Sequence, residues 1–128
     1  MKKYKPTTKS LRNTAMDSFK NVLTVNEPHK ALTTGFRRGS GRNAYGRITT
    51  RHKGGGHKRS FREIDFKMEK VNIPAKIETV EYDPNRSGFI GLICYADGVR
   101  RYNLLPHGLK VGDSVITSVD APVKLGNR

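Results

Sequence analysis

The chain has 128 residues, with 25 Lys and Arg against 11 Asp and Glu, and a formal net charge of +14. The apolar share of 34% is low for a fully globular chain, so one domain with an extension is the simplest organisation. No apolar run approaches a membrane span, no signal peptide begins the chain, and a single cysteine excludes an internal disulfide. We therefore expect a soluble, intracellular protein without a membrane partner.

The excess charge is confined to the first half of the chain. Residues 1–70 hold 18 Lys and Arg against 5 Asp and Glu, whereas residues 71–128 hold 7 against 6. The strand-like apolar pattern lies almost entirely after residue 58. We expect a basic, largely irregular N-terminal extension over residues 1–45 and a folded domain over residues 46–128.

The first predicted elements are weak. Thr14 to Val25 has apolar residues at roughly helical spacing, which indicates a short helix or turn that docks on a partner. Arg47–His52 contains Ile48 and two threonines, and this composition predicts a strand. After the glycine triplet Gly54–Gly56, Arg59–Lys67 carries apolar residues among charges and is also strand-like.

The next segment predicts a distorted strand. Apolar and charged residues alternate from Pro74 to Tyr82, but the phase slips before Val80, which a β-bulge or a sharply coiled strand would explain. The following residues, Tyr82 to Gly88, have the composition of a turn.

The last part of the chain predicts a hairpin and a final strand. Phe89–Tyr95 is apolar at both odd and even positions, which is typical of a central strand that is covered on both faces. Asp97-Gly98 predicts the tight turn that pairs it with Val99–Leu105. Pro106–Gly112 is a connection with room for one helical turn, and Ser114–Val119 is a last strand.

Five or six short strands with glycine-rich connections predict an all-β fold. The preferred architecture is a small five-stranded OB-fold-like barrel. An SH3-like barrel fits the same pattern and remains the alternative.

The candidate binding site is the stretch between Phe36 and Phe66, in which cations alternate with glycines and no acidic residue precedes Glu63. Arginine presents a planar fork of donors that matches phosphate oxygens, and glycine lets a peptide N–H approach a ligand closely. A polyanion such as RNA would supply the missing charge, although a flexible loop that is merely basic is the alternative. The predicted RNA-binding residues are Arg37, Arg38, Arg42, Arg47, Arg51, His52, Lys53, Gly54, Gly55, Gly56, His57, Lys58, Arg59 and Arg62.

Several aromatic residues could stack on unpaired bases, but they fall at apolar strand positions, so core packing is the default for most. These residues are Phe61, Phe66, Tyr82, Phe89, Tyr95 and Tyr102. Arg100 and Arg101 must point to opposite faces of a strand, so at most one can serve a given face. Cys94, inside an apolar run, is expected to be a small buried hydrophobe.

Other kinds of site receive little support. His52 and His57 lack the further ligands that a metal needs and the carboxylate partner that acid–base catalysis needs. Gly41 and Gly46 have the spacing of a nucleotide-binding loop without its Lys and Ser/Thr. We predict no catalytic residue, metal, cofactor or small-molecule substrate.

Six motifs stand in an order and spacing that one family shares: Gly41-Arg42-Asn43, Gly46-Arg47-Ile48-Thr49, Arg51-His52, Gly54-Gly55-Gly56-His57-Lys58, Ile64-Asp65-Phe66 and Glu81-Tyr82-Asp83-Pro84-Asn85-Arg86-Ser87. They resemble large-subunit ribosomal protein L2 of the bacterial or organellar type, and the resemblance covers nearly the whole chain. It implies an OB-fold domain with a basic extension, bound to large-subunit rRNA near the subunit interface among other ribosomal components. It also implies that Arg86 contributes to RNA binding.

The resemblance implies a structural, non-enzymatic role in a cytoplasmic or organellar ribosome, supporting subunit association and the peptidyl-transferase region. The family continues into a second, SH3-like domain, whereas this sequence stops at Arg128, so we expect a fragment, a split protein or the ordered part of a longer chain. The alternatives are a generic polyanion- or RNA-binding module outside the ribosome, a small RNA-processing enzyme that uses His52 and His57, and a binder of anionic membranes.

Overall fold

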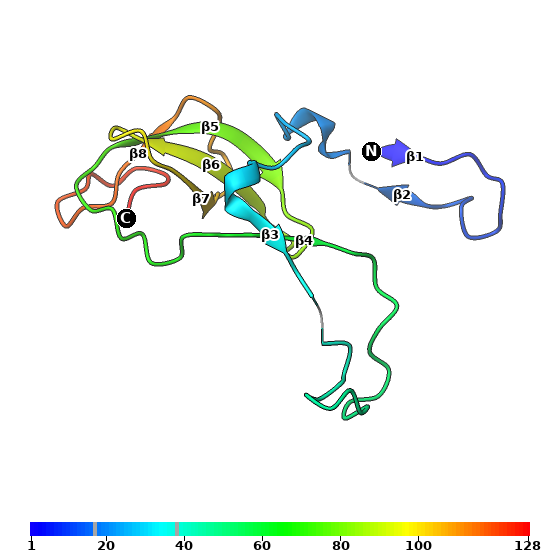
Figure 1. The fold of residues 1–128 in the computed structure, drawn as a ribbon. Helices are drawn as coiled ribbons and strands as arrows, with labels where there is room; N and C mark the ends of the chain where they lie inside the picture. The colour runs from blue at the N-terminus through cyan, green and yellow to red at the C-terminus, as the bar shows by residue number, and fades with distance from the viewer. Residues whose placement is uncertain (17, 38) are drawn as a thin grey trace.

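The computed structural model describes residues 1–16, 18–37 and 39–128. Its body is a curled four-stranded antiparallel sheet, the central sheet, in the order β7-β6-β5-β8 (Figure 1). The strands of this sheet are β5 (Ala75–Tyr82), β6 (Phe89–Tyr95), β7 (Arg100–Leu104) and β8 (Ser114–Val115).

Two short ribbons lie outside the central sheet. One pairs β1 (Lys2–Lys3) with β2 (Ala15–Met16), and the other pairs β3 (Thr33–Gly35) with β4 (Ser60–Arg62). The helical elements of the described residues are two 3-10 turns, η1 (Phe19–Asn21) and η2 (Lys30–Leu32). The chain is therefore mostly strand and irregular structure, and no α-helix occurs in the described residues.

Strand β6 is central and is covered on both faces, as its apolar residues predict. Ile93 and Tyr95 pack in one cluster with residues of β5, including Ile77. Ile90 and Leu92 point to the other face and pack with a second cluster, which contains the fully buried Tyr102 and is covered by Leu32 and Ile64. The segments on either side of the predicted binding region thus help to cover the second face.

The predicted bulge in β5 is confirmed. The pairing of β5 with β6 shifts between Ile77 and Thr79, so Glu78 is the extra residue. Because of this shift, Val80 joins Ile77 in the first cluster, while Glu81 lies beside Tyr102 on the other side. The turn after β5 and the Asp97-Gly98 hairpin turn are also confirmed, and Gly98 has a φ of 82° that glycine adopts without strain.

Two predicted strands are wrong or too long. Arg47–His52 forms no strand, because only Ile48 makes a bridge, to Arg42, and no sheet lies beside it to complete the hydrogen bonds. The strand predicted to end at Val119 ends at Val115, and the backbone beyond it binds the C-terminal residues instead, with the Ser118 N–H donating to the Arg128 carbonyl at 2.8 Å.

Two other segments are also less regular than predicted. Of Arg59–Lys67, only Ser60–Arg62 is a strand, followed by a single parallel bridge from Ile64 to Tyr102. Residues 106–112 form turns rather than a helix.

The segment after β2, predicted as a short helix or turn, contacts the chain's own sheet. Phe19 in η1 lies edge-on to Phe89 at 5.4 Å between ring centroids and stacks on Tyr82 at 6.0 Å. Thr24 bonds Val80 in both directions, since its N–H donates to the Val80 carbonyl at 3.0 Å and its hydroxyl accepts the Val80 N–H at 2.9 Å. β8 covers this edge of β5 only at Ala75 and Lys76, so Thr24 satisfies backbone groups that β8 does not reach.

Candidate nucleic-acid interface

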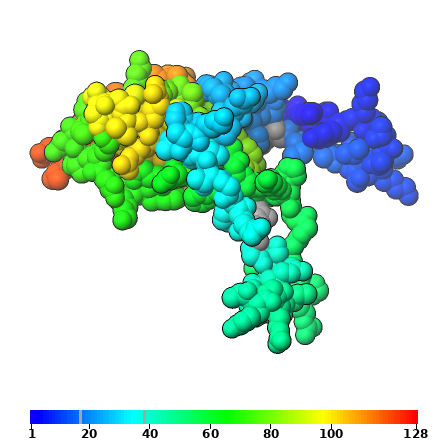
Figure 2. All heavy atoms as spheres, viewed as in Figure 1, coloured from blue at the N-terminus to red at the C-terminus, as the bar shows by residue number. Residues whose placement is uncertain are grey.

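Residues 36–59, which we call the basic loop, leave the central sheet through the ribbon of β3 and β4. Gly35 pairs with Ser60 at the end of that ribbon, and the loop beyond it stands away from the sheet (Figure 1). In the space-filling view, the loop is a stalk with solvent on several sides (Figure 2). Its side chains are almost all exposed, as expected for a segment without an apolar core.

The segments that flank the ribbon of β3 and β4, from which the basic loop extends, are both fastened to one buried tyrosine. The hydroxyl of Tyr102 accepts the backbone N–H of His29, just before η2, at 2.6 Å and donates to Glu81 Oε2 at 2.6 Å. The backbone carbonyl of Tyr102 accepts the N–H of Asp65, just after β4, at 2.9 Å. Burial and the hydrogen bond to Glu81 raise the pKa of Tyr102, so its hydroxyl keeps the proton that it donates.

The tip of the basic loop is folded by its own polar groups. The Gly41 carbonyl accepts the backbone N–H groups of Thr49 at 2.8 Å and Thr50 at 3.1 Å. Gly41 has a φ of 71°, and a Cβ on it would lie 2.2 Å from the Thr50 carbonyl oxygen, so only glycine fits. Asn43 Oδ1 accepts the N–H groups of Tyr45 and Arg47, each at 3.0 Å. The tip is therefore an ordered turn.

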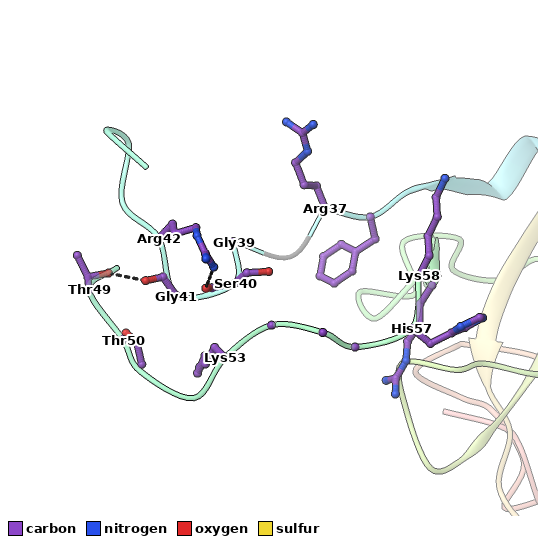
Figure 3. A pocket seen from close by; sticks show the side chains of 15 residues that line it. Arg37, Gly39, Ser40, Gly41, Arg42, Thr49, Thr50, Lys53, His57 and Lys58 are labelled. Atoms are coloured by element: carbon purple, nitrogen blue, oxygen red, sulfur yellow. Dashed lines mark hydrogen bonds between the residues drawn. The ribbon is translucent and has the colours of Figure 1, made fainter. Parts of the chain in front are cut away.

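The two sides of the basic loop border a half-open cavity of about 790 Å³. Figure 3 shows Gly41 and Arg42 on one side and Thr50 and Lys53 on the other, with Lys58 nearer the sheet. Gly54, Gly55 and Gly56 form the part of the wall between Lys53 and Lys58. Because glycine has no side chain, this part of the wall is bare backbone. Cations and bare peptide groups therefore border the same space.

The cations of the basic loop differ from those of the sheet in their partners. Within residues 1–16, 18–37 and 39–128, ion pairs join Lys70 to Asp97, Arg86 to Asp83, Arg100 to Glu78, and Arg101 to Asp65 and Glu69. No described cation of the basic loop has a carboxylate partner. These exposed cations are Arg37, Arg42, Arg47, Arg51, Lys53, Lys58 and Arg59, while Arg38 lies outside the described residues.

Arg62 and Arg86 are placed apart from the exposed cations of the loop. Arg62 is only 8% exposed, and its guanidinium donates to the Ser60 carbonyl at 3.0 Å. The Nε of Arg86 donates to Asp83 Oδ2 at 2.5 Å, and its guanidinium lies 5.5 Å from the ring centre of Phe66. Asp83 is fully buried, so Arg86 neutralises a buried carboxylate instead of projecting from the turn.

The two histidines of the loop lie on the surface and do not belong to a metal-binding cluster of the described residues. His52 and His57 are both exposed, and His52 has a φ of 58°. Among the described residues, no three His, Cys, Asp or Glu side chains lie close enough together to hold a metal ion. The same residues include no helix that is long and apolar enough to cross a bilayer.

Core packing holds for some of the predicted aromatic residues and fails for others. Tyr95 and Tyr102 are buried, whereas Phe61, Phe66 and Tyr82 are exposed. Sequence reasoning missed Phe36, which stacks on Phe61 with ring centroids 5.7 Å apart and planes at 29°. Thr34 pairs with Phe61 across the ribbon, so Phe36 lies diagonal to Phe61. The sequence alone does not show this pairing, and therefore does not show that the two rings are neighbours.

Arg100 and Arg101, predicted to face opposite ways, each bind carboxylates of the chain's own fold. Arg100 forms two hydrogen bonds with Glu78, and Arg101 donates to Asp65 at 3.0 Å. Neither is a free cation of the kind that the basic loop presents. Cys94, expected to be buried, is half-buried.

A small β-sheet holds out a folded, glycine-rich loop of exposed cations, which is an arrangement typical of a nucleic-acid-binding module. Residues 29–117 match the family described as Ribosomal Proteins L2, RNA binding N-terminal domain. The match covers more than half of the chain, and the chain belongs to this family. It is thus a ribosomal protein of the large subunit, an rRNA-binding constituent of the particle that carries out translation.

Proposed function

We propose that this chain binds large-subunit rRNA mainly through the basic loop, as a structural constituent without catalytic activity. The observation that carries the proposal is that the described cations of the loop are exposed and have no carboxylate of their own chain as a partner. Such groups release counterions when phosphates replace water around them. The glycine triplet lets sugar–phosphate strands approach the backbone.

The predicted site residues have distinct roles in this proposal. Arginines of the loop bind phosphate oxygens through paired N–H donors, whereas Lys53 and Lys58 act as point charges. His52 and His57 add donors to the same surface. Arg86 shapes the turn beside the sheet, and any contact it makes with RNA uses the part of its side chain that remains exposed.

Recognition then depends on shape, phosphates and 2′-hydroxyls, since the deep groove of A-form RNA does not admit side chains that read bases. The anchors at Tyr102 hold the base of the loop before RNA arrives, which reduces the ordering that binding requires. The tip turn at Gly41 and Asn43 acts in the same way.

The finer parts of the proposal follow the family and the motif pattern. We propose that residues 1–45 act as a basic extension of an OB-fold-like module over residues 46–128, although the family match already begins at residue 29. The chain would lie near the subunit interface of a cytoplasmic or organellar ribosome, beside other ribosomal components. There it would support subunit association and the peptidyl-transferase region.

The test is a salt titration of binding to a large-subunit rRNA fragment. If about six to ten phosphates are contacted, affinity falls by roughly 10³–10⁵ between 50 and 200 mM salt. A variant that replaces Arg42, Arg47, Arg51, Lys53 and Lys58 with Gln should reduce the salt slope by about 4 to 5. The control replaces Lys67, Lys76, Lys110, Lys124 and Arg128 with Gln, which removes the same charge from the rest of the chain.

Equal loss of slope in the two variants would show that net charge, rather than the basic loop, drives binding. Competition with duplex DNA and heparin separates a dedicated rRNA protein from a generic polyanion binder, since a generic binder would not prefer the rRNA. Incubation with labelled RNA should give no cleavage. Turnover that is lost on His52→Ala or His57→Ala would contradict the non-enzymatic role.

A further inference from the structure

Two phenylalanine rings lie exposed at the base of the basic loop, beyond the cover of the central sheet. Phe36 is 45% exposed and Phe61 is 38% exposed, although their rings stack on each other. Neither belongs to the two buried clusters or to the residues packed against them. More than a third of each side chain stays in contact with water, so the pair keeps apolar surface that a further ring could cover.

Phe36 connects this pair to the cavity of the basic loop. It contacts Phe61 on one side and lines the cavity, whereas Phe61 is not among the lining residues. Another part of the wall contains the glycine triplet, and a Cβ placed on Gly55 would meet no atom within 4 Å. A flat ring and an open backbone wall thus border one space.

The size and charge of this space fit a nucleotide. Its volume of about 790 Å³ lies within the roughly 300–1,000 Å³ typical of sites for small organic ligands. Arg42 and Lys53 line it near the tip, and Lys58 lines it nearer the sheet (Figure 3). Arg59, directly before β4, is also a lining residue. Cations are therefore available for a phosphate on either side of a base that enters the cavity.

We propose that the cavity of the basic loop receives one unpaired nucleotide of the rRNA, whose base stacks on Phe36 while its phosphates bind the flanking cations. This inference rests on the proposed function. It adds a preference for RNA that presents an unpaired base, which phosphate binding alone would not give. Phe61 supports the Phe36 ring from behind. Every base has a π-face, so the site selects an extruded base without selecting which base it is.

The test compares two RNA hairpins that share one stem, one fully paired and one with a single bulged 2-aminopurine. Wild-type protein should bind the bulged RNA about fivefold to a hundredfold more tightly, and stacking should quench 2-aminopurine fluorescence. Phe36→Leu should remove the preference and the quenching, yet bind the paired hairpin with unchanged affinity and salt slope. Phe36→Trp should keep both signals.

Tyr45→Leu is the matched control, because Tyr45 is an exposed aromatic residue of the same loop that does not line the cavity. This variant should behave like wild type with both hairpins. Salt-dependent binding without any preference for the bulge in wild-type protein would overturn the inference and leave the proposed function intact. Loss of preference in Tyr45→Leu to the same degree as in Phe36→Leu would also overturn it. Weak, salt-insensitive binding of both hairpins would instead count against the proposed function itself.

Discussion

The basic loop and the central sheet use the same residue type in opposite ways. In the sheet, Arg86, Arg100 and Arg101 each bind a carboxylate that the fold brings close. In the described part of the loop, arginines stay exposed and find no acidic partner. An arginine near a carboxylate of its own chain stabilises the fold, while one without such a partner is available to a phosphate. Position relative to acidic residues, rather than residue type, therefore separates the structural cations from the candidate binding cations.

Packing separates the two regions just as clearly. The sheet buries side chains in two clusters on opposite faces of β6. The loop keeps its shape through backbone hydrogen bonds to Gly41 and side-chain hydrogen bonds to Asn43. Because few apolar contacts hold the loop, changes there should affect affinity more than stability, and changes in the sheet should do the reverse.

The largest expected effect separates two isoleucines. Ile93 is 1% exposed in the first cluster, whereas Ile48 in the basic loop is 65% exposed. Ile93→Ala should lower the free energy of unfolding by about 2–5 kcal/mol, because it removes buried apolar contacts and leaves a cavity. Ile48→Ala should change it by less than about 0.5 kcal/mol. Denaturant unfolding measures both, and similar losses would contradict the division into a packed sheet and an unpacked loop.

A second comparison uses two arginines. Arg86→Ala leaves the fully buried Asp83 without its cation and should destabilise the fold by about 2–4 kcal/mol, less than for a fully buried pair because Arg86 is partly exposed. Arg47→Ala should leave stability unchanged and weaken rRNA binding. Unfolding and binding are measured on both variants. If Arg86→Ala kept full stability and lost only affinity, Arg86 would belong with the loop cations.

A third change acts where the two regions meet. Tyr102→Phe removes the hydroxyl that links Glu81 to the His29 N–H, so buried polar groups lose a partner. We expect a loss of about 1–3 kcal/mol in unfolding free energy and faster hydrogen exchange at His29. Tyr45→Phe, at a 90% exposed position, is the control and should change neither. Unaltered exchange at His29 in the Tyr102 variant would show that this anchor does not hold the loop base.

The smallest expected effect is a pH dependence that belongs to the sheet. The hydrogen bond from Arg100 lowers the pKa of Glu78 from its ordinary value of 4.5. The folded state therefore favours the ionised carboxylate of Glu78. The ion pair stabilises the fold at pH values above the ordinary pKa, and this stabilisation is lost as the pH falls through the lowered pKa. Because the pair is partly exposed, the loss should stay below about 1 kcal/mol.

The Glu78 contribution is isolated by comparing wild type with Glu78→Gln in unfolding experiments at a series of pH values. The difference between the two proteins should be constant above pH 4.5 and shrink as the pH decreases below it. A difference that grew with acidification would reverse the assigned sign.

The sequence by itself determined the features that depend on near neighbours along the chain. Apolar residues at both odd and even positions predicted the doubly covered strand β6, and Asp97-Gly98 predicted the hairpin turn. The slip in alternation predicted a bulge or a sharply coiled strand in β5, and the structure places a bulge there, at Glu78. The block of cations and glycines between Phe36 and Phe66 marked the candidate site, since charge composition needs no fold to be recognised.

Only the tertiary structure decided which residues inside that block and beside it are free to bind. Arg62 is buried and Arg86 is held by Asp83, while Phe36 meets Phe61 across a ribbon that joins distant parts of the chain. Arg47–His52 has the composition of a strand but has no neighbouring sheet to pair with. Each of these outcomes depends on contacts between residues far apart in sequence, which local composition and periodicity do not encode.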